Sequence, residues 1–248
     1  MKSPGDLQPL LAKPGAEIAG MFDSIARRYD TLNHLLSAGL DRRWRARAVR
    51  ELRLSGRERV LDICTGTADL ALALVEPKDG AGAREVVGVD FAHEMLKVGL
   101  AKTRVAQGLS PAHRIFLARG DAMNLPLPGA AFDAASIGFG IRNVQRPDAA
   151  LREIARTLKP GGRLVILEFG FPRIPGISAL YKWYFRAVLP RVGKAISKHG
   201  KAYSYLPASV ERFPTPEAFA DEMKKAGFRE VRTVPLTLGI VYLYVAEL

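Results

Sequence analysis

The feature that most constrains the fold is a regular alternation of short apolar runs with helical patterns along the central part of the chain. Apolar runs of strand length occupy residues 59–64, 85–90, 114–121, 132–140 and 163–169, and helical patterns occupy 69–76, 94–106 and 148–158 among them. Strands that alternate with helices of this length pair in parallel through right-handed crossovers. The alternation therefore predicts an α/β fold with a doubly wound, Rossmann-like sheet.

The rest of the chain is predicted to surround this core as one domain. A chain of 248 residues with 48% hydrophobic content fits a single α/β domain, which we expect to span 18–248. Residues 1–17 are rich in Pro, Gly and polar residues, which predicts a mobile segment. Residues 18–53 show a helical pattern and are predicted to form a lid. The alternation stops over 171–210, where we expect a helical insertion after the fifth strand, and one helix and two strands then complete the chain.

A strand, a turn of small residues and a helix follow one another at residues 60–69, as in a nucleotide-binding turn. Such a turn leaves the backbone N–H groups at the start of the helix free for a ligand. Its sequence, CTGTAD, places Gly66 between the small residues Cys64 and Ala68 and lacks the G-x-G-x-x-G pattern of dinucleotide sites. The turn alone indicates either a cofactor site or a plain tight turn.

Three acidic residues at the ends of successive predicted strands strengthen the prediction of a cofactor site. Asp62 precedes the turn, Asp90 ends the second strand and Asp121 ends the third. The carboxyl ends of parallel strands lie at one edge of the sheet, where ligands bind. Asp90 can accept hydrogen bonds from both hydroxyls of a ribose, can cap the helix that follows, or can do both. Asp121, followed by Ala122, lies where an adenine ring is expected.

Several segments resemble the successive motifs of class I S-adenosylmethionine-dependent methyltransferases, namely LDICTGTADL, GVDFAHEMLKVG, GDAMNLPLPGAAFD, GFGIRNV and LREIARTLKPGGRLVILEF. Within that class, YDTLN at 29–33 and RTLKPGG at 156–162 resemble the signatures of the quinone-biosynthesis C-methyltransferases, with Thr157 where Val is commoner. The resemblance implies a seven-stranded sheet whose last strand is antiparallel. It also implies S-adenosyl-L-methionine as the cofactor.

Ten residues are candidate cofactor-binding positions, taken from the strand ends, the turn and the resemblance. They are Asp62, Thr65, Gly66, Thr67, Asp90, Phe91, Met95, Asp121, Ala122 and Gly138. At Gly138 the family often has Ser, so a side-chain contact is not expected there. The chain has one cysteine and four histidines without the spacing of metal ligands, so neither a metal nor an intramolecular disulfide is expected.

The resemblance implies C-methylation of the ring of a prenylated quinol, most closely the conversion of demethylmenaquinol to menaquinol. A ring hydroxyl with a pKa of about 10 must first lose its proton, and at pH 7 roughly one molecule in a thousand is ionised. Arg142 and Asn143 are candidates to stabilise that oxygen. Alternatively, Arg142 pairs with a carboxylate and Asn143 caps the next helix. Tyr29 is either a substrate contact or a packing residue, and His34 and His199 are either bases or surface histidines.

The charge of the chain points to an anionic partner. The net charge is +12, which suits nucleic acid, an anionic membrane or an acidic substrate. Residues 171–210 hold seven Lys or Arg, no Asp or Glu, and several aromatic residues, a composition typical of a membrane interface. A solvated basic cover over the active site is the alternative. With no apolar run of bilayer length and no signal peptide, we expect a cytoplasmic protein, peripheral at the inner face of the cell membrane. A homodimer is left open.

Three other functions fit parts of the sequence. A nucleic-acid methyltransferase would explain the charge, but the chain has neither an N/D-P-P-Y/F motif after the fourth strand nor paired cysteines, so no nucleic-acid partner is expected. A methyltransferase that acts on another phenol or on a sterol would share the cofactor motifs. A binding protein of the same fold without catalysis would have no need of three strand-end acids.

Overall fold

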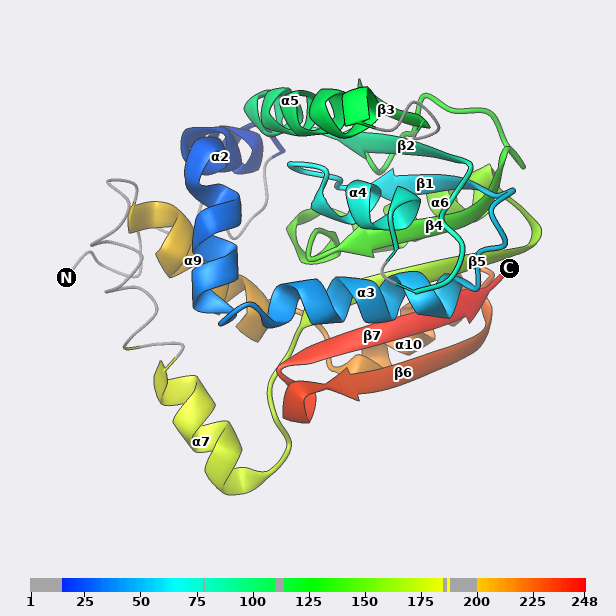
Figure 1. Cartoon of the computed structure of the whole chain (residues 1–248). Helices are drawn as coiled ribbons and strands as arrows, with labels where there is room; N and C mark the ends of the chain where they lie inside the picture. Colours follow the sequence, from blue (N-terminus) through cyan, green and yellow to red (C-terminus); the bar gives the residue numbers. More distant parts are fainter. Residues whose placement is uncertain (1–14, 78, 110–113, 185–186, 188–199) are drawn as a thin grey trace.

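A computed structural model describes residues 15–77, 79–109, 114–184, 187 and 200–248, with a seven-stranded sheet at its centre (Figure 1). The strands are β1 (Arg59–Ile63), β2 (Glu85–Asp90), β3 (Arg114–Arg119), β4 (Phe132–Gly138), β5 (Leu158–Phe169), β6 (Arg229–Leu236) and β7 (Val241–Glu247). Their order in the sheet is β3-β2-β1-β4-β5-β7-β6. β7 runs antiparallel to both β5 and β6, whereas the other neighbours are parallel. The predicted seven-stranded sheet with an antiparallel last strand is confirmed.

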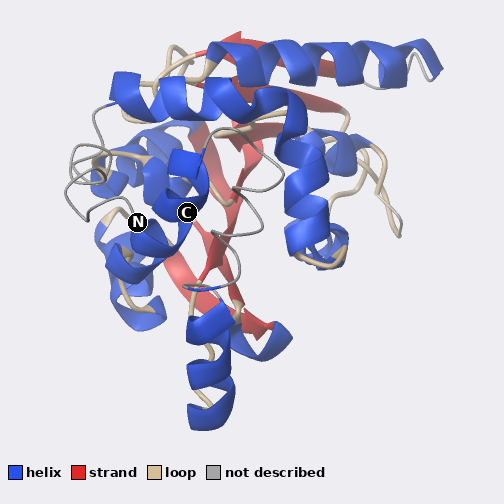
Figure 2. Cartoon of the chain, turned by 90° about the vertical axis from the view of Figure 1, so that its left-hand side faces the viewer, coloured by secondary structure: helices blue, strands red, loops and turns tan. Residues whose placement is uncertain are grey.

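Helices cover both faces of the sheet, as the doubly wound prediction requires (Figures 1 and 2). One face carries α3 (Leu40–Leu52), α4 (Asp69–Val75) and α5 (His93–Leu109), and the other carries α6 (Pro147–Thr157) and α10 (Pro216–Lys225). Neighbouring residues of a strand point to opposite faces. Accordingly, Val60 belongs to the core cluster under α3 and α4, whereas Leu61 belongs to the cluster under α6 and α10. Since both faces are covered, the carboxyl edge of the sheet is the region where loops are free to form a site.

β5 begins five residues earlier than predicted. Residues 159–162 lie between the predicted helix at 148–158 and the predicted strand at 163–169, and they belong to β5. The register of β5 against β4 shifts between Phe132 and Ala134, and Gly161 has a φ of 76°. A bulge absorbs the extra residues, and glycine allows the left-handed backbone that it contains.

Two helical segments extend beyond this core at the carboxyl edge of the sheet (Figures 1 and 2). α2 (Gly15–Leu36) packs against α5 and against α9 (Gly200–Arg212), and the chain turns at Ala38 and Gly39 before α3. α2 therefore includes the last residues of the segment predicted to be mobile. α7 (Pro175–Trp183) projects away from the sheet, and 188–199 of the predicted insertion lie outside the described residues. Within the described part of the chain, no helix is long and apolar enough to cross a membrane.

Candidate active site

The turn after β1 has an unusual backbone that places it close to the neighbouring loops. Cys64, Gly66 and Ala68 have φ values of 54°, 56° and 65°, in a region that residues other than glycine seldom adopt. The N–H of Thr65 donates to the carbonyl of Val89 at 3.1 Å, so the turn stays in register with β2. A side chain at Gly140 would place its Cβ 2.3 Å from the Cβ of Cys64. The loop after β4 therefore needs glycine at 140 to pass the turn.

Asp62 lies beneath this turn. Its carboxylate is fully buried and accepts hydrogen bonds from the hydroxyls of Ser136 at 2.6 Å and Thr65 at 2.7 Å. Burial raises the pKa of Asp62 to about 6, and the two hydroxyl hydrogen bonds act in the opposite direction. The hydrogen bonds of Asp62 with Thr65 and Ser136 thus stabilise the conformation of the turn.

A cavity of about 340 Å³ lies at the carboxyl ends of β1, β2 and β4, beside α2. We refer to it as the cofactor cavity. Its volume is in the range of small-molecule sites. Seven of the ten candidate cofactor residues line it: Gly66, Asp90, Phe91, Met95, Asp121, Ala122 and Gly138. Asp62, Thr65 and Thr67 lie outside its lining. Residues that the sequence analysis did not single out also contribute, among them Ala19 and Phe22 of α2.

Asp90 joins the turn to the start of α5 and also faces the cofactor cavity. Its two carboxylate oxygens accept hydrogen bonds from the N–H groups of Gly66 and Ala92, each at 2.8 Å. Burial raises the pKa of Asp90, and these backbone donors oppose the shift. The helix itself is capped from α2, because the N–H of Glu94 donates to Asp23 at 2.7 Å. A carboxylate has about four acceptor positions, so Asp90 has capacity left for a ligand.

The far side of the cofactor cavity combines a carboxylate with apolar surface. Asp121 accepts a hydrogen bond from the N–H of Met123 at 2.8 Å, just beyond β3. Phe91 lies under the guanidinium of Arg119, which is 5.7 Å from the centre of the ring. At Gly138, a Cβ would lie 3.3 Å from Leu70. A serine at this position would therefore be tightly packed here.

Thr67 belongs to a polar network that fastens α2 to the core. Its hydroxyl donates to Asp30 at 2.5 Å. Lys102 of α5 donates to Asp30 at 2.8 Å and also pairs with Asp69 at the start of α4. Asp30 of the YDTLN motif therefore anchors α2, whereas the adjacent Tyr29 lines the cofactor cavity and a second cavity beside it.

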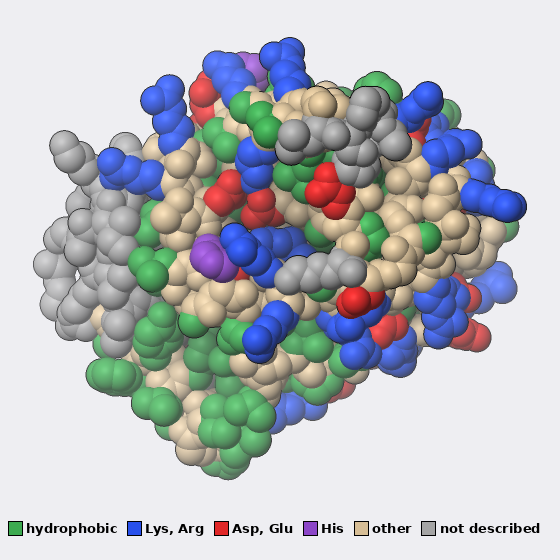
Figure 3. Space-filling view, in the orientation of Figure 1, with side chains coloured by type: hydrophobic (Ala, Val, Ile, Leu, Met, Phe, Trp, Pro, Cys, Tyr) green, Lys and Arg blue, Asp and Glu red, His purple; other side chains and the backbone are tan. Residues whose placement is uncertain are grey.

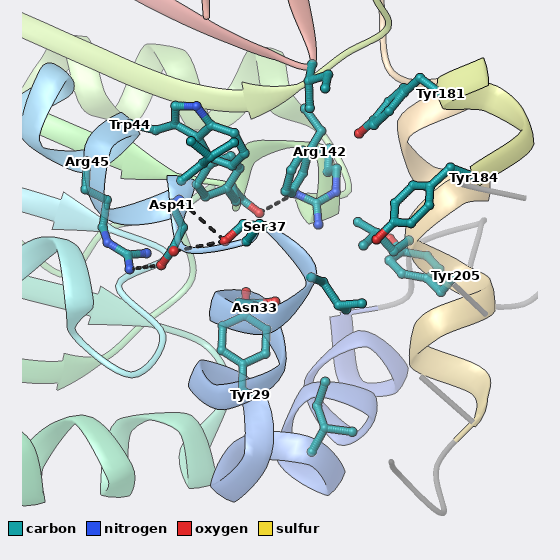
Figure 4. Close-up of a pocket in the computed structure, with 18 of the residues that line it drawn as sticks. Tyr29, Asn33, Ser37, Asp41, Trp44, Arg45, Arg142, Tyr181, Tyr184 and Tyr205 are labelled. Carbon is teal, nitrogen blue, oxygen red and sulfur yellow. Dashed lines mark hydrogen bonds and ion pairs between the residues drawn. The ribbon is translucent and has the colours of Figure 1, made fainter. Parts of the chain in front are cut away.

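A second cavity, of about 580 Å³, adjoins the first (Figure 4). We refer to it as the acceptor cavity. Its walls come from α2, α3, α7 and α9, from the loop after β4, from the end of β5 and from Ile240 before β7, and most of the side chains are apolar or aromatic. Phe22, Tyr29 and Phe139 line both cavities and form a shared wall. Phe139 has a φ of 61°, and its ring lies 4.5 Å from that of Phe169.

Arg142 is buried in η2 (Ile141–Asn143), a short 3₁₀ helix after β4, and it lines the acceptor cavity. Its Nη1 donates to Glu168 at 2.7 Å and to the carbonyl of Phe139 at 2.5 Å, and its Nε donates to Ser209 at 3.4 Å. The predicted carboxylate partner therefore exists, and it is the fully buried Glu168. Nη2 has no acceptor among the described residues. In Figure 4 the guanidinium points into the cavity, opposite Tyr29.

Asn143 lines the cofactor cavity next to Arg142. Its Nδ2 is 3.5 Å from the carbonyl of Phe139, and its Oδ1 is buried without a hydrogen-bond partner among the described residues. The alternative that Asn143 caps the next helix is wrong, because the N-cap position of α6 is Arg146, whose side chain makes no capping hydrogen bond. The reason is that Asn143 belongs to η2, three residues before this N-cap, and its side chain lines the cofactor cavity.

The remaining catalytic candidates lie in different places. Burial raises the pKa of Tyr29, and the charge of Arg142 is the largest effect that opposes the shift. His34 lies 3.1 Å from Asp41, outside the lining of the acceptor cavity, whereas Asp41 itself lines it. His199 lies outside the described residues. Sequence reasoning missed Glu168, although it lies near the end of β5 as Asp90 lies at the end of β2, so the same strand-end signal was available.

Comparison with known proteins gives one family and one fold. The chain matches the ubiE/COQ5 methyltransferase family over residues 12–247. It is 50% identical over 232 residues to the ubiquinone/menaquinone biosynthesis C-methyltransferase UbiE of Syntrophotalea carbinolica, covering 94% of each chain. It is 48% identical over 227 residues to the demethylmenaquinone methyltransferase of Thermus thermophilus, covering 92% of this chain and 99% of that one. A solved S-adenosylmethionine-dependent methyltransferase of Thermotoga maritima has a TM-score of 0.61 at 22% identity, covering 93% of this chain and 99% of that one, which shows a shared fold.

Proposed function

Because the chain belongs to the ubiE/COQ5 methyltransferase family, we propose that it methylates a ring carbon of a prenylated quinol, with demethylmenaquinol as the acceptor. The observation that carries the proposal is the pair of adjoining cavities with one shared wall. The first has strand-end acids and backbone turns suited to a nucleoside. The second is mostly apolar and aromatic and contains the guanidinium of Arg142, which suits a ring that develops negative charge on oxygen.

The cofactor cavity fits S-adenosylmethionine by the chemistry of its lining. Asp90 would accept hydrogen bonds from the ribose, and Phe91 and Met95 would pack against the adenine near Asp121. Asn143 supplies a buried oxygen without a partner among the described residues, and a cationic ligand would stabilise such an acceptor. In this arrangement Asp62, Thr65 and Thr67 support the site from outside the cavity.

The protein's own contribution to the reaction is to align the ring and to favour its ionised form. When bound, S-adenosylmethionine supplies an activated methyl group: the ring carbon's electron pair forms the new bond, the electrons of the S–C bond stay on sulfur, and the ring proton is released. Arg142 would stabilise the ring oxygen through Nη2, while Glu168 holds the guanidinium through Nη1. Its structural and catalytic roles are therefore compatible. Tyr29, in the shared wall, would contact the ring.

The apolar mouth of the acceptor cavity supports a further part of the proposal, namely peripheral contact with a membrane. Leu180 and Trp183 line the cavity, and 65% and 60% of their surfaces are exposed. Figure 3 shows hydrophobic side chains gathered at the lower left, over α7. Tryptophan favours the headgroup region of bilayers, and a prenyl chain partitions into their interior. A quinol could thus enter the cavity from lipid along α7.

Transfer of label from S-adenosylmethionine tests the proposal directly. Purified protein would be given a short-chain demethylmenaquinol kept reduced, the matching benzoquinol, a soluble phenol and RNA, with Asp90→Ala as the control variant. We expect label in the naphthoquinol, and mass spectrometry should show one added methyl on the ring. A deletion strain should accumulate a quinone lighter by one methyl. Label found only in RNA or in the soluble phenol, with both quinols unmodified, would refute the proposal.

A further inference from the structure

The hydroxyl of Tyr205 is buried, and the part of the chain that the structure describes offers it no hydrogen-bond partner. Its ring, on α9, packs against Ile18, Met21, Ile25 and Leu32 of α2 and is 1% exposed. The hydroxyl has no hydrogen-bond partner among the described residues, and Tyr205 lines the acceptor cavity. Buried polar groups are nearly always paired, and an exception calls for an explanation. A ligand in the cavity is one explanation.

The same helix face also contacts Arg142. Ser209 follows Tyr205 by one helical turn, so the two side chains lie on the same side of α9. The hydroxyl of Ser209 accepts the hydrogen bond from Nε of Arg142 at 3.4 Å and donates to the carbonyl of Leu206 at 2.9 Å. This hydrogen bond fixes the position of α9 relative to the guanidinium of Arg142. Figure 4 shows Tyr205 and Arg142 in the wall of one cavity.

The electrostatic environment keeps the Tyr205 hydroxyl in its donor form. Burial raises its pKa, and the charges of Arg142 and Glu168 act on it in opposite directions. The phenol therefore stays protonated at any pH at which the protein works. The Tyr205 hydroxyl, which has no acceptor among the described residues, and the guanidinium of Arg142 thus both belong to a largely apolar cavity.

We propose that the Tyr205 hydroxyl donates a hydrogen bond to a ring oxygen of the acceptor, and so recognises a phenol or quinol together with Arg142. This inference rests on the proposed function for the identity of the acceptor. It assigns to α9 a part in recognising the ring, beyond covering it. An aromatic compound of the same shape without a ring oxygen would lose this interaction.

Tyr205→Phe tests the assignment, because it removes the hydroxyl and keeps the packing ring. Tyr244→Phe is the matched control, since Tyr244 is a buried tyrosine of β7 outside the lining of both cavities. We expect Tyr205→Phe to lower turnover with the quinol by roughly 10- to 100-fold, the effect of losing one hydrogen bond to a charged group. Its thermal midpoint without acceptor should equal or exceed that of the parent, and its affinity for S-adenosylhomocysteine should be unchanged.

A nitronaphthol whose absorbance reports its ionisation separates this inference from the proposed function. Bound to the parent, its apparent pKa should fall, and in Tyr205→Phe it should fall less. An equal pKa and equal affinity in both proteins would overturn the assignment while leaving quinol methylation intact. A Tyr205→Phe protein that unfolds would also overturn it, by showing that the hydroxyl serves the fold. If the parent shifts the naphthol's pKa through Tyr205 but methylates no quinol, the proposed function fails and the assignment stands.

Discussion

The cofactor cavity and the acceptor cavity are built by different parts of the fold. The first is formed mainly by strand ends and tight turns, whose backbone conformations, such as the φ of 56° at Gly66, fix the positions of its groups. The second is enclosed mainly by side chains from four helices, with the loop after β4 and the end of β5, and α2 and α9 come from opposite ends of the chain. A site made of backbone can be recognised from short motifs. A site made of packed helices depends on contacts that no single segment encodes.

The two cavities are nevertheless mechanically linked through α2. Phe22 and Tyr29 of this helix line both of them. The helix is held on the cofactor side by Asp30 with Lys102 and by Asp23, which caps α5. Substitutions at residues that line only one cavity are therefore needed to separate cofactor binding from acceptor binding.

Arg142 lines the acceptor cavity and hydrogen-bonds to Phe139 of the shared wall, and its replacement is expected to have the largest effect. Arg142→Ala leaves the carboxylate of Glu168 buried without its cation, which should lower the free energy of unfolding by about 3–5 kcal/mol. Turnover should fall by roughly 10²–10³-fold, far more than the affinity for S-adenosylhomocysteine. Residual activity should rise more steeply with pH than in the parent, because more quinol is then ionised in solution. Denaturant unfolding measures the stability, calorimetry measures the affinity, and pH–rate profiles measure turnover and its pH dependence.

Two further variants separate the charge pair from the chemistry. Arg142→Met combined with Glu168→Gln removes both buried charges, and it should recover most of the stability but not the turnover. Arg142→Lys should recover only part of the rate, since an ammonium lacks the fixed fork of the guanidinium. If the double variant regains turnover along with stability, Arg142 acts through the fold alone.

On the cofactor side, Asp62 predicts how the free energy of unfolding depends on pH. Its folded pKa of about 6 lies above the ordinary 3.8, so its protonation stabilises the folded state. This contribution is complete below about pH 4 and is lost as the pH rises through about 6. The full shift corresponds to about 3 kcal/mol. Asp62→Asn should therefore be more stable than the parent at pH 7, by up to about 3 kcal/mol, and the difference should vanish near pH 4.

Asp133 provides a control of opposite sign. Its pKa is lowered although burial opposes the shift, because Arg59 and Lys159 hydrogen-bond to its carboxylate. Asp133→Asn should therefore be less stable than the parent at neutral pH, and this difference should also disappear as the pH falls through the folded pKa. Denaturant unfolding across a pH series measures both variants. A constant difference between Asp62→Asn and its parent would show that Asp62 does not take up a proton in this range.

Asp90 is expected to affect the cofactor cavity alone. Asp90→Ala should weaken binding of S-adenosylhomocysteine by about 1.5–3 kcal/mol, the range for hydrogen bonds to charged groups. The variant also removes the acceptor of the Gly66 and Ala92 N–H groups, so Asp90→Asn, which keeps one oxygen, is needed beside it. Calorimetric titration measures both, with Asp221→Ala on the exposed side of α10 as the control. Unchanged affinity in folded Asp90→Ala would exclude a ribose contact.

The same contrast explains what could be predicted from the sequence. The sheet and the cavity positions of Asp90 and Asp121 were predictable, because hydrophobic periodicity locates strand ends and ligands bind there. The place of Asp62 beneath the turn was not, because side chains alternate between faces and the turn geometry decides which face the ligand meets. Tyr205 was missed because it lies in a helix without a motif, and only the packing of α9 against α2 brings it to the cavity.

The acceptor side has one prediction that depends on the surface alone. We expect the protein to bind anionic vesicles and to bind less as salt rises, because screening shortens the reach of its charges. Lys194, Lys198 and Lys201, whose side chains lie outside the described part, should each contribute about 1 kcal/mol at an anionic surface. Replacing each of them with Gln should therefore weaken binding without unfolding the protein.

The two tryptophans provide an internal comparison for the same binding experiment: Trp183 is exposed on α7 and Trp44 is buried. Trp183 emission should move to shorter wavelength on binding, and Trp183→Phe should abolish that change while Trp44 emission stays constant. Equal binding to neutral and anionic vesicles would exclude an electrostatic cause, and an unchanged Trp183 spectrum would exclude α7 from the contact.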